Sequence, residues 1–177
     1  MKVNIKAGTY TINTVLDRNL GGTSSNQVWW SGYKTTPGDL DELWSDQKTE
    51  GTDFPKINLT ANYWIERGGH WWFSSLSCET TSNVRPALWP STGDSFIWNC
   101  KLKRSGSTTG KVLDLGQRCN VLNTTIEYAG NSYTTGFAHI NLNTNYINCV
   151  FLGDPTFSNA ISGSQWYGAV YGCIFKN

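Results

Sequence analysis

The stretch Ile147-Asn148-Cys149-Val150-Phe151 decides the fold, because its pattern occurs five times in the chain. A large apolar residue is followed by a small polar residue or Gly, by Cys or Thr, by a variable residue and, except at Thr80, by an apolar residue. The other four copies are Leu76-Ser77-Cys78-Glu79-Thr80, Trp98-Asn99-Cys100-Lys101-Leu102, Leu122-Asn123-Thr124-Thr125-Ile126 and Tyr171-Gly172-Cys173-Ile174-Phe175. The central residues are 22, 24, 25 and 24 positions apart. This period, without a helical pattern, predicts a parallel β-solenoid with rungs of 22–25 residues.

The same pattern predicts how the rungs stack. Asn and Gly tolerate left-handed backbone angles, so the second position is expected to form a bend between two strands. Side chains alternate along a strand, so the third and fifth positions are expected to point inward together. The third positions form a predicted interior column of Cys78, Cys100, Thr124, Cys149 and Cys173. The second positions form a predicted amide ladder of Asn99, Asn123 and Asn148 at the bend.

Composition agrees with an all-β fold and argues against several functions. Asn, Thr, Ser and Gly make up 71 of the 177 residues, which disfavours long helices. A net charge of +1 gives no basic excess for binding nucleic acid. No apolar stretch reaches the roughly 18 residues needed for membrane insertion. We therefore expect neither a nucleic-acid partner nor a membrane-spanning segment.

The five cysteines contain no C-x-x-C pair, and the two histidines lie far apart. This spacing fits neither a zinc site nor a closed disulfide framework. The column cysteines are therefore predicted to be reduced and buried, and no metal or other cofactor is expected. Cys119 falls outside the column and is the one candidate for a reactive thiol.

The length fits one domain spanning residues 1–177. Residues 1–66 are predicted to form irregular amino-terminal rungs and capping loops, and residues 67–177 the regular rungs. Asp39 is a candidate cap for a short helix over residues 40–44. The polar stretch 45–60 is predicted to be a loop inserted into the solenoid.

Two amino-terminal stretches carry a resemblance to a known superfamily. Residues 5–12 (Ile-Lys-Ala-Gly-Thr-Tyr-Thr-Ile) and residues 22–39 resemble the opening rungs of pectate-lyase-like right-handed parallel β-helices. The Asn-Cys-Val-Phe repeats resemble the later rungs of the same superfamily. The resemblance implies a short, right-handed, single-stranded parallel β-helix.

The superfamily includes polysaccharide lyases, glycosidases, bacteriophage tailspikes and non-catalytic virion proteins. The resemblance implies a non-catalytic structural protein of a bacteriophage particle, either a capsid decoration or a tail spike or fibre component. Such a viral protein would be assembled in the host cytoplasm and reside in the virion. The alternative is a polysaccharide-degrading or glycan-binding β-helix domain of a tailspike or of a secreted, extracellular protein.

An enzyme of this kind needs a pair of carboxylates across a groove, or a calcium-binding cluster with a base. The column after the cysteines, which reads Glu79, Lys101, Thr125, Val150 and Ile174, holds one acid and one base. We expect these two to form a surface ion pair. Glu66, His70 and Asp114 are the weak catalytic candidates, and His70 has no obvious carboxylate partner in the sequence. We therefore expect no enzymatic activity.

Nine tryptophans include the adjacent pairs Trp29-Trp30 and Trp71-Trp72. Neighbours in a strand face opposite sides, so one member of each pair is expected outside or under a loop. Loop cover, a protein interface and stacking on a surface glycan remain open for these side chains. The candidates chosen for an interface or glycan contact are Trp30, Trp64 and Trp71.

The outer face also becomes apolar toward the carboxyl end, at Val150 and Ile174. This change predicts contact with another chain, either in a homo-oligomer or with other virion proteins. The resemblance to phage β-helices implies a trimer.

Overall fold

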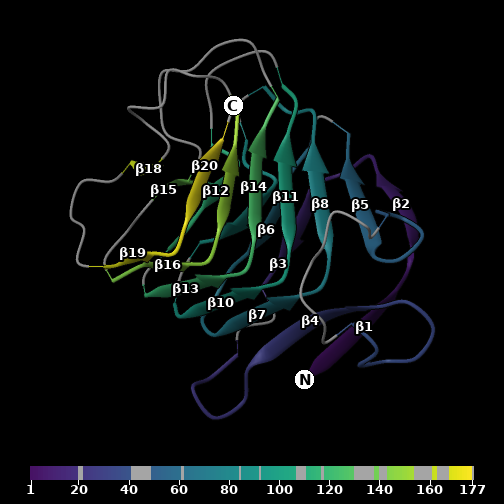
Figure 1. Cartoon of the computed structure of the whole chain (residues 1–177). Helices are drawn as coiled ribbons and strands as arrows, with labels where there is room; N and C mark the ends of the chain where they lie inside the picture. Colours follow the sequence, from purple (N-terminus) through teal and green to yellow (C-terminus); the bar gives the residue numbers. More distant parts are fainter. Residues whose placement is uncertain are drawn as a thin grey trace.

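The chain folds into a parallel β-solenoid with three sheets (Figure 1). The computed structural model describes residues 1–19, 22–40, 49–60, 62–83, 85–91, 93–106, 111–116, 118–129, 138–139, 143–153, 161–162 and 168–176. These residues form no helix. Each coil adds one strand to each sheet, and neighbouring strands pair in parallel. The predicted parallel β-helix is therefore confirmed.

We refer to the three sheets as A, B and C. Sheet A contains β1 (Lys2–Lys6), β4 (Val28–Tyr33), β7 (Trp71–Ser74), β10 (Ser95–Trp98), β13 (Cys119–Leu122), β16 (Asn145–Ile147) and β19 (Val170–Tyr171). Sheet B contains β2 (Gly8–Ile12), β5 (Pro55–Leu59), β8 (Ser77–Thr80), β11 (Lys101–Arg104), β14 (Thr125–Tyr128), β17 (Val150–Leu152) and β20 (Ile174–Lys176). Sheet C contains β3 (Leu16–Arg18), β6 (Trp64–Glu66), β9 (Leu88–Pro90), β12 (Leu113–Asp114), β15 (Ala138–His139) and β18 (Ile161–Ser162).

The strand pairing corrects the register of the first repeat by two residues. Lys101 pairs with Ser77, and Trp98 pairs with Ser74. Cys100 therefore stacks on Leu76 rather than on Cys78. The third-position column is Leu76, Cys100, Thr124, Cys149 and Cys173, whose members are 24, 24, 25 and 24 residues apart. Cys78 belongs to the fifth-position column, with Leu102, Ile126, Phe151 and Phe175.

The predicted bend between sheets A and B is confirmed by the backbone angles. Ser75, Asn99, Asn123, Asn148 and Gly172 have φ values of 53°, 54°, 48°, 51° and 62°. The Asn99 amide donates a hydrogen bond to Ser75 Oγ at 3.1 Å, which links the bends of two successive coils. At Gly172 a Cβ atom would lie 2.3 Å from Asn148 Oδ1, so Gly suits this bend for space as well as for its backbone angle.

A second left-handed bend leads from sheet C into sheet A, and the sequence pattern did not reveal it. His70, Arg118 and Asn143 have φ values of 63°, 44° and 58°. The sheet A register places the three at equivalent corners of their coils. Every non-glycine residue with positive φ in the described ranges lies at one of the two bends that flank sheet A.

The interior is mainly apolar, with the rings of Phe151 and Phe175 stacked in parallel at a centroid distance of 4.9 Å. All five cysteines are free. Cys78, Cys100 and Cys149 are buried as predicted, and Cys173 is half-buried. The prediction for Cys119 was wrong: its side chain is also buried, because position 119 of β13 points inward like Val121.

The amino-terminal third joins the same three sheets through β1 to β6. The predicted loop over residues 45–60 was wrong for its last part, because Pro55–Leu59 forms β5. Ile57 and Leu59 alternate inward between Lys56 and Asn58, which is the pattern of a strand with one buried face. The predicted helix over residues 40–44 lies beyond Leu40 outside the described residues.

Candidate functional site

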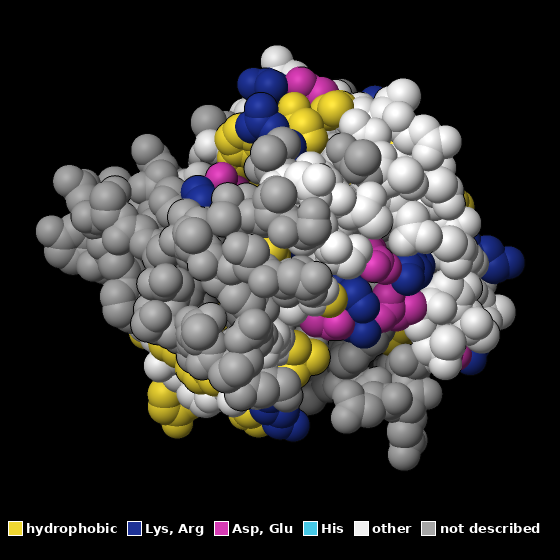
Figure 2. All heavy atoms as spheres, turned by 90° about the horizontal axis from the view of Figure 1, so that it is seen from above, with side chains coloured by type: hydrophobic (Ala, Val, Ile, Leu, Met, Phe, Trp, Pro, Cys, Tyr) yellow, Lys and Arg dark blue, Asp and Glu magenta, His cyan; other side chains and the backbone are white. Residues whose placement is uncertain are grey.

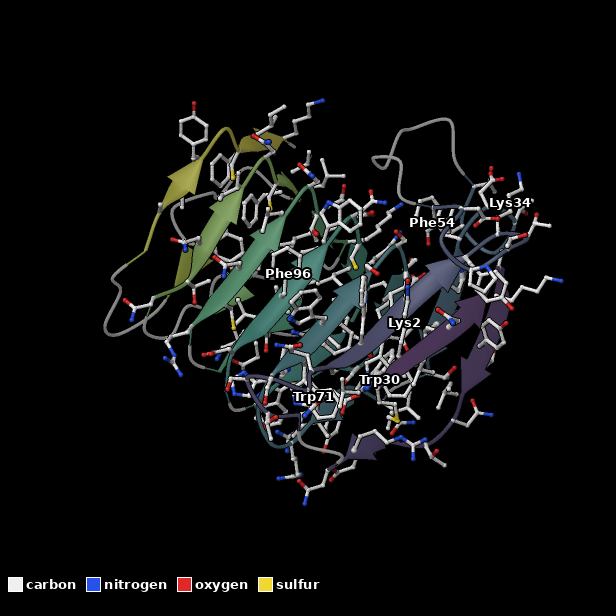
Figure 3. The ribbon with its side chains drawn as sticks, turned by 90° about the horizontal axis from the view of Figure 1, so that it is seen from below. Lys2, Trp30, Lys34, Phe54, Trp71 and Phe96 are labelled. Carbon is white, nitrogen blue, oxygen red and sulfur yellow. The ribbon has the colours of Figure 1, made fainter. Side chains whose placement is uncertain are left out.

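The outer face of sheet A carries a row of stacked aromatic side chains. Trp29, Trp72 and Phe96 occupy the same position in three successive strands, β4, β7 and β10. The ring centroids of Trp29 and Trp72 are 5.3 Å apart, and those of Trp72 and Phe96 are also 5.3 Å apart. Figure 3 views the molecule from the side of sheet A, with Phe96 on β10 labelled. All three side chains are half-buried rather than fully covered.

A second outward row lies beside the first and completes a groove. It consists of Trp98, Leu122, Ile147 and Tyr171, one from each of β10, β13, β16 and β19. A hollow of about 280 Å³ between the rows is lined by Trp29, Trp72, Ser74, Phe96, Trp98 and Leu122, and we call it the aromatic groove. Trp29 Nε1 donates to Ser74 Oγ at 2.8 Å, and Ser74 Oγ donates to Ser31 Oγ at 3.1 Å. These bonds fix one wall of the groove.

The three tryptophans chosen from the sequence point the other way. Trp71 is 0 % exposed and Trp64 is 2 % exposed, so both belong to the core. Trp30 packs against that core and contacts the edge of Trp64. Their burial contradicts the prediction, because alternation shows only that neighbouring side chains face opposite sides, and the position of the bend decides which of them points outward. Counting back from the bend at Asn99 assigns position 98 outward, 97 inward and 96 outward.

A polar pocket of about 340 Å³ adjoins the aromatic groove and shares Trp72 and Phe96 with it. Its other lining residues are Ser24, Gln27, His70, Asp94, Ser95, Arg118 and Asn120. His70 Nδ1 lies 3.6 Å from Asp94 Oδ2, and Arg118 Nε lies 2.7 Å from Asp94 Oδ1. His70 therefore has the carboxylate partner that the sequence did not suggest. The partner comes from the equivalent corner one coil later.

The outer face of sheet B carries ion pairs between side chains of β5, β8, β11 and β14. Lys56 Nζ lies 2.8 Å from Glu79 Oε2, and Lys103 Nζ lies 3.0 Å from Glu127 Oε1. In the corrected register Glu79 lies opposite Lys103, and Lys101 lies opposite Ser77 rather than opposite Glu79 as expected. In the structure Lys101 Nζ instead contacts Glu50 Oε1 at 2.5 Å. Figure 2 shows basic and acidic side chains intermingled in one cluster on the surface.

The three weak catalytic candidates occupy separate places. Glu66 is 0 % exposed inside the solenoid, where its Oε1 accepts a hydrogen bond from Trp64 Nε1 at 2.6 Å. Burial raises the pKa of Glu66 to about 7. His70 lines the polar pocket at the edge of sheet A. Asp114 lies in β12 of sheet C, with Lys111 Nζ 3.2 Å from its carboxylate.

The two assembly candidates lie next to each other on the outer face of sheet B. Val150 of β17 pairs with Ile174 of β20. Val150 is half-buried, and Ile174 is 49 % exposed.

Comparison with known proteins finds no protein family, curated protein or solved structure that matches the chain. In the described ranges, no group of three or more His, Cys, Asp or Glu side chains is placed to hold a metal ion. The same ranges contain no helix long and apolar enough to cross a membrane. The aromatic groove of sheet A and the adjoining polar pocket together form the candidate site.

Proposed function

We propose that the protein is a non-catalytic structural protein of a bacteriophage particle, as a capsid decoration or as a tail spike or fibre component. It meets its partner through the aromatic groove of sheet A. The observation that carries the binding role is the stacked outward row Trp29, Trp72 and Phe96 on a rigid sheet. The assignment to a phage particle, and with it the location in the virion, rests on the resemblance of residues 5–12 and 22–39.

The groove is suited to binding because its aromatic side chains are ordered before a partner arrives. Trp29 is held by its bond to Ser74 and by the Lys2 ammonium, which lies 4.2 Å from the centroid of the Trp29 ring. Aromatic side chains supply a large contact area at a small cost in conformational entropy. A partner therefore gains apolar contact without having to order the groove.

The arrangement of carboxylates supports a non-catalytic role. Along the outer face of sheet B, Glu79, Lys103 and Glu127 occupy successive coils. The lysine separates the two acids, so they do not form the facing pair that glycoside hydrolysis needs. Glu66, the acid with the raised pKa, lies inside the solenoid away from any substrate.

The size of the face favours a narrow partner or a repeated contact. Seven strands spaced ~4.8 Å apart and about four residues wide give a face of roughly 400 Å². A stable pairwise protein interface buries about 800 Å² on each partner. A particle overcomes this limit by presenting several copies at once. We therefore propose a homo-oligomer, a trimer by resemblance, or docking onto other virion proteins, with Val150 and Ile174 as a further contact.

A second candidate function is glycan binding, and the polar pocket favours it. Trp72 and Phe96 line both the aromatic groove and the polar pocket. A sugar ring stacked on these side chains would place its hydroxyl groups beside Asp94, Arg118 and Asn120. Carboxylate, guanidinium and amide groups all form hydrogen bonds with hydroxyls. A secreted or tailspike-borne binding domain is the corresponding setting.

The test compares particle binding with glycan binding. Immunogold labelling of particles purified from the source culture locates the chain, and a glycan array measures sugar binding by the isolated protein. We expect labelled particles, and we expect Trp72→Ala to abolish attachment to particles that lack the protein. Lys103→Ala, an outward change on sheet B, serves as the matched control and leaves attachment intact. Unlabelled particles together with array binding that Trp72→Ala abolishes would establish the second candidate instead.

A further inference from the structure

Two of the free cysteines occupy the same position in adjacent coils. Val150 pairs with Ile174 in sheet B, so Cys149 and Cys173, one residue earlier in each coil, lie side by side in the third-position column. The backbone fixes this register, because Ile174 N donates to Cys149 O at 2.9 Å. Parallel strands lie ~4.8 Å apart, which is within the Cα separation of about 4.4–6.8 Å that a disulfide spans. The two cysteines are therefore within bridging range.

The two thiols also point in the same direction. Cys149 Sγ donates to Val121 O at 3.3 Å, and Cys173 Sγ donates to Tyr146 O at 3.4 Å. Val121 and Tyr146 are themselves paired in adjacent strands, so each acceptor lies one coil before its thiol. The Cys173 thiol is thus directed toward the coil that contains Cys149. Cysteines whose Cβ atoms point apart need backbone movement before they can be bridged, and this pair avoids that obstacle.

The other cysteines have no cysteine at the matching position of an adjacent described strand. Their neighbours are Leu76 and Thr124 beside Cys100, Ile57 and Leu102 beside Cys78, and Ser95 beside Cys119. The register therefore selects one pair from the five thiols.

Cys173 is also the cysteine that solvent reaches, since it is half-buried and the other four are buried. In the described part of the chain, β19 and β20 on either side of it each pair with a single strand (Figure 1). A strand with one partner can shift slightly. Closure needs such a shift, because the Cβ atoms of a disulfide lie about 3.5–4.5 Å apart, a little closer than neighbouring strands.

We propose that Cys149 and Cys173 form a modification site, at which a small-molecule disulfide of the glutathione type introduces a bridge between the two coils. The bridge depends neither on the aromatic groove nor on the assignment to a phage particle. Oxidising surroundings outside the cell favour such a bridge, and the reducing cytosol opposes it. A chain made in the cytosol would fold with free thiols and acquire the bridge after release.

The bridge forms in two exchange steps. The Cys173 thiol loses its proton to solvent, and its thiolate attacks one sulfur of the small disulfide, which gives a mixed disulfide and releases one small thiolate. The Cys149 thiolate, formed in the same way, then attacks the Cys173 sulfur and releases the second small thiolate. Both small thiolates take up a proton. Two cysteine thiols are oxidised, and one small disulfide is reduced to two thiols.

The second step is expected to be the slow one. Burial raises the pKa of Cys149 to about 12, and the neighbouring Cys173 adds to the rise. The thiolate is the reactive form, so closure should accelerate ~10-fold for each pH unit above 7. The burial of Cys149 does not prevent the reaction, because its target is the sulfur of the adjacent coil and not the small disulfide itself.

Thiol counting and peptide mapping of the wild-type protein test the site without any variant. The reduced protein is incubated with oxidised glutathione at pH 8, quenched with acid and unfolded in urea. We expect the number of free thiols to fall from five to three, with one cross-linked peptide pair that contains Cys149 and Cys173. Five remaining thiols, a mixed disulfide at Cys173 that never closes, or a bridge between other cysteines would overturn the proposal.

Serine variants separate the two steps. Cys149→Ser should stop at the mixed disulfide on Cys173, which adds the mass of one bound glutathione. Cys173→Ser should keep its four thiols free. Cys100→Ser, in the same column but beside Thr124, is the matched control and should form the bridge as the wild-type protein does. A bridge in Cys173→Ser, or its loss in a folded Cys100→Ser, would contradict the assigned pair.

Hydrogen exchange measures what the bridge does to the fold. The linked residues are 24 positions apart, so the bridge restricts the open form of the coil that contains β20. Exchange of the peptide spanning β20 should slow at least ~10-fold on oxidation and recover with reductant, whereas β2 at the other end of sheet B should not change. Equal exchange of β20 in the reduced and bridged proteins would show that the bridge does not fix this coil.

Discussion

Sheets A and B are built from the same successive coils, yet their outer faces have opposite chemistry. The outer face of sheet A stacks Trp29, Trp72 and Phe96 in successive coils. The outer face of sheet B stacks charges, with Lys103 between Glu79 and Glu127. In-register parallel strands bring equivalent side chains within about 5 Å, and like charges directly opposite destabilise a sheet. Stacking is therefore favourable on both faces: on sheet A through contacts between uncharged rings, and on sheet B through alternation of positive and negative side chains.

A loop residue completes the charge pattern of sheet B. The neighbouring column has Lys56 and Lys101 on either side of Ser77. Glu50 inserts at this gap: its carboxylate accepts from Ser77 Oγ at 2.8 Å and lies 2.5 Å from Lys101 Nζ and 3.8 Å from Lys56 Nζ. The outer face of sheet B from β5 to β14 thus pairs its own charges, whereas sheet A leaves apolar surface that a partner can cover. This difference is the reason why we propose sheet A as the face for recognition.

The largest expected effect is a difference in stability between substitutions on the inner and the outer side of sheet A. Trp71→Ala removes a fully buried side chain and should lower the free energy of unfolding by about 3–5 kcal/mol. Trp72→Ala removes the outward neighbour and should cost about 1 kcal/mol. Urea denaturation measures both changes. Similar losses for the two variants would show that the outward row is part of the core and not a free face.

The next effect tests the bend that separates sheet A from sheet B. Asn123→Leu should destabilise the fold by about 1–2 kcal/mol, because residue 123 has a left-handed φ of 48° that Leu adopts poorly. Asn120→Leu, an exposed strand position in the same coil, should change stability by less than about 0.5 kcal/mol. Asn123→Gly should recover most of the loss. Equal urea midpoints for the two Leu variants would contradict the assignment.

A smaller effect tests the charged face. Burial alone would raise the pKa of Glu50, but hydrogen bonds from Lys101 and Ser77 outweigh it and lower this pKa below 4.5. Its pairing thus stabilises the fold above pH 4.5 and is lost as pH falls through the folded-state pKa. Glu50→Gln should cost about 1 kcal/mol at pH 7 and less as pH falls below 4.5. A cost that is the same at both pH values would mean that the ion pairs of Glu50 contribute no stability.

The smallest effect concerns the reactivity of the cysteine thiols inside the solenoid, and it involves no change in stability. Burial raises the pKa of Cys100, Cys119 and Cys149 to about 12 and that of Cys78 further. Titration of the native protein with a thiol reagent should therefore detect one fast group, at the half-buried Cys173. Unfolding in urea should release all five. A second fast thiol, or loss of the fast thiol only in a Cys119→Ser variant, would contradict this interior arrangement.

The repeat alone predicted the solenoid, its period and the bend at Asn99, Asn123 and Asn148, because bends and inward positions recur at fixed intervals. It misplaced the first copy because Ser75 and Ser77 both fit the bend position, and Leu76 fits the interior as well as Cys78 does. Only strand pairing separates these alternatives, since the two registers differ by two residues and leave every side chain on the same face.

Because both registers leave every side chain on the same face, the outward residues of the site could be predicted from the sequence. From either register, counting back from the bend places Trp72 outward and Trp71 inward, so the sequence contains the information that the choice of Trp71 overlooked. The contact of His70 with Asp94 was likewise accessible, because the two are 24 residues apart, which is one period. The insertion of Glu50 was not accessible, because it reaches sheet B from a loop outside the repeat.

The left-handed bends on both sides of sheet A have a consequence for how such a chain diverges. Ser75, Asn99, Asn123 and Asn148 at one corner, and His70, Arg118 and Asn143 at the other, set where each strand of the sheet begins and ends. The strand boundaries therefore do not depend on the outward side chains between them. Mutation can exchange Trp72 or Phe96 for other residues at little cost to the fold, whereas a residue at a bend position must also adopt left-handed backbone angles. In a lineage under pressure to change partners, substitutions will accumulate on the outer face of sheet A and spare its corners.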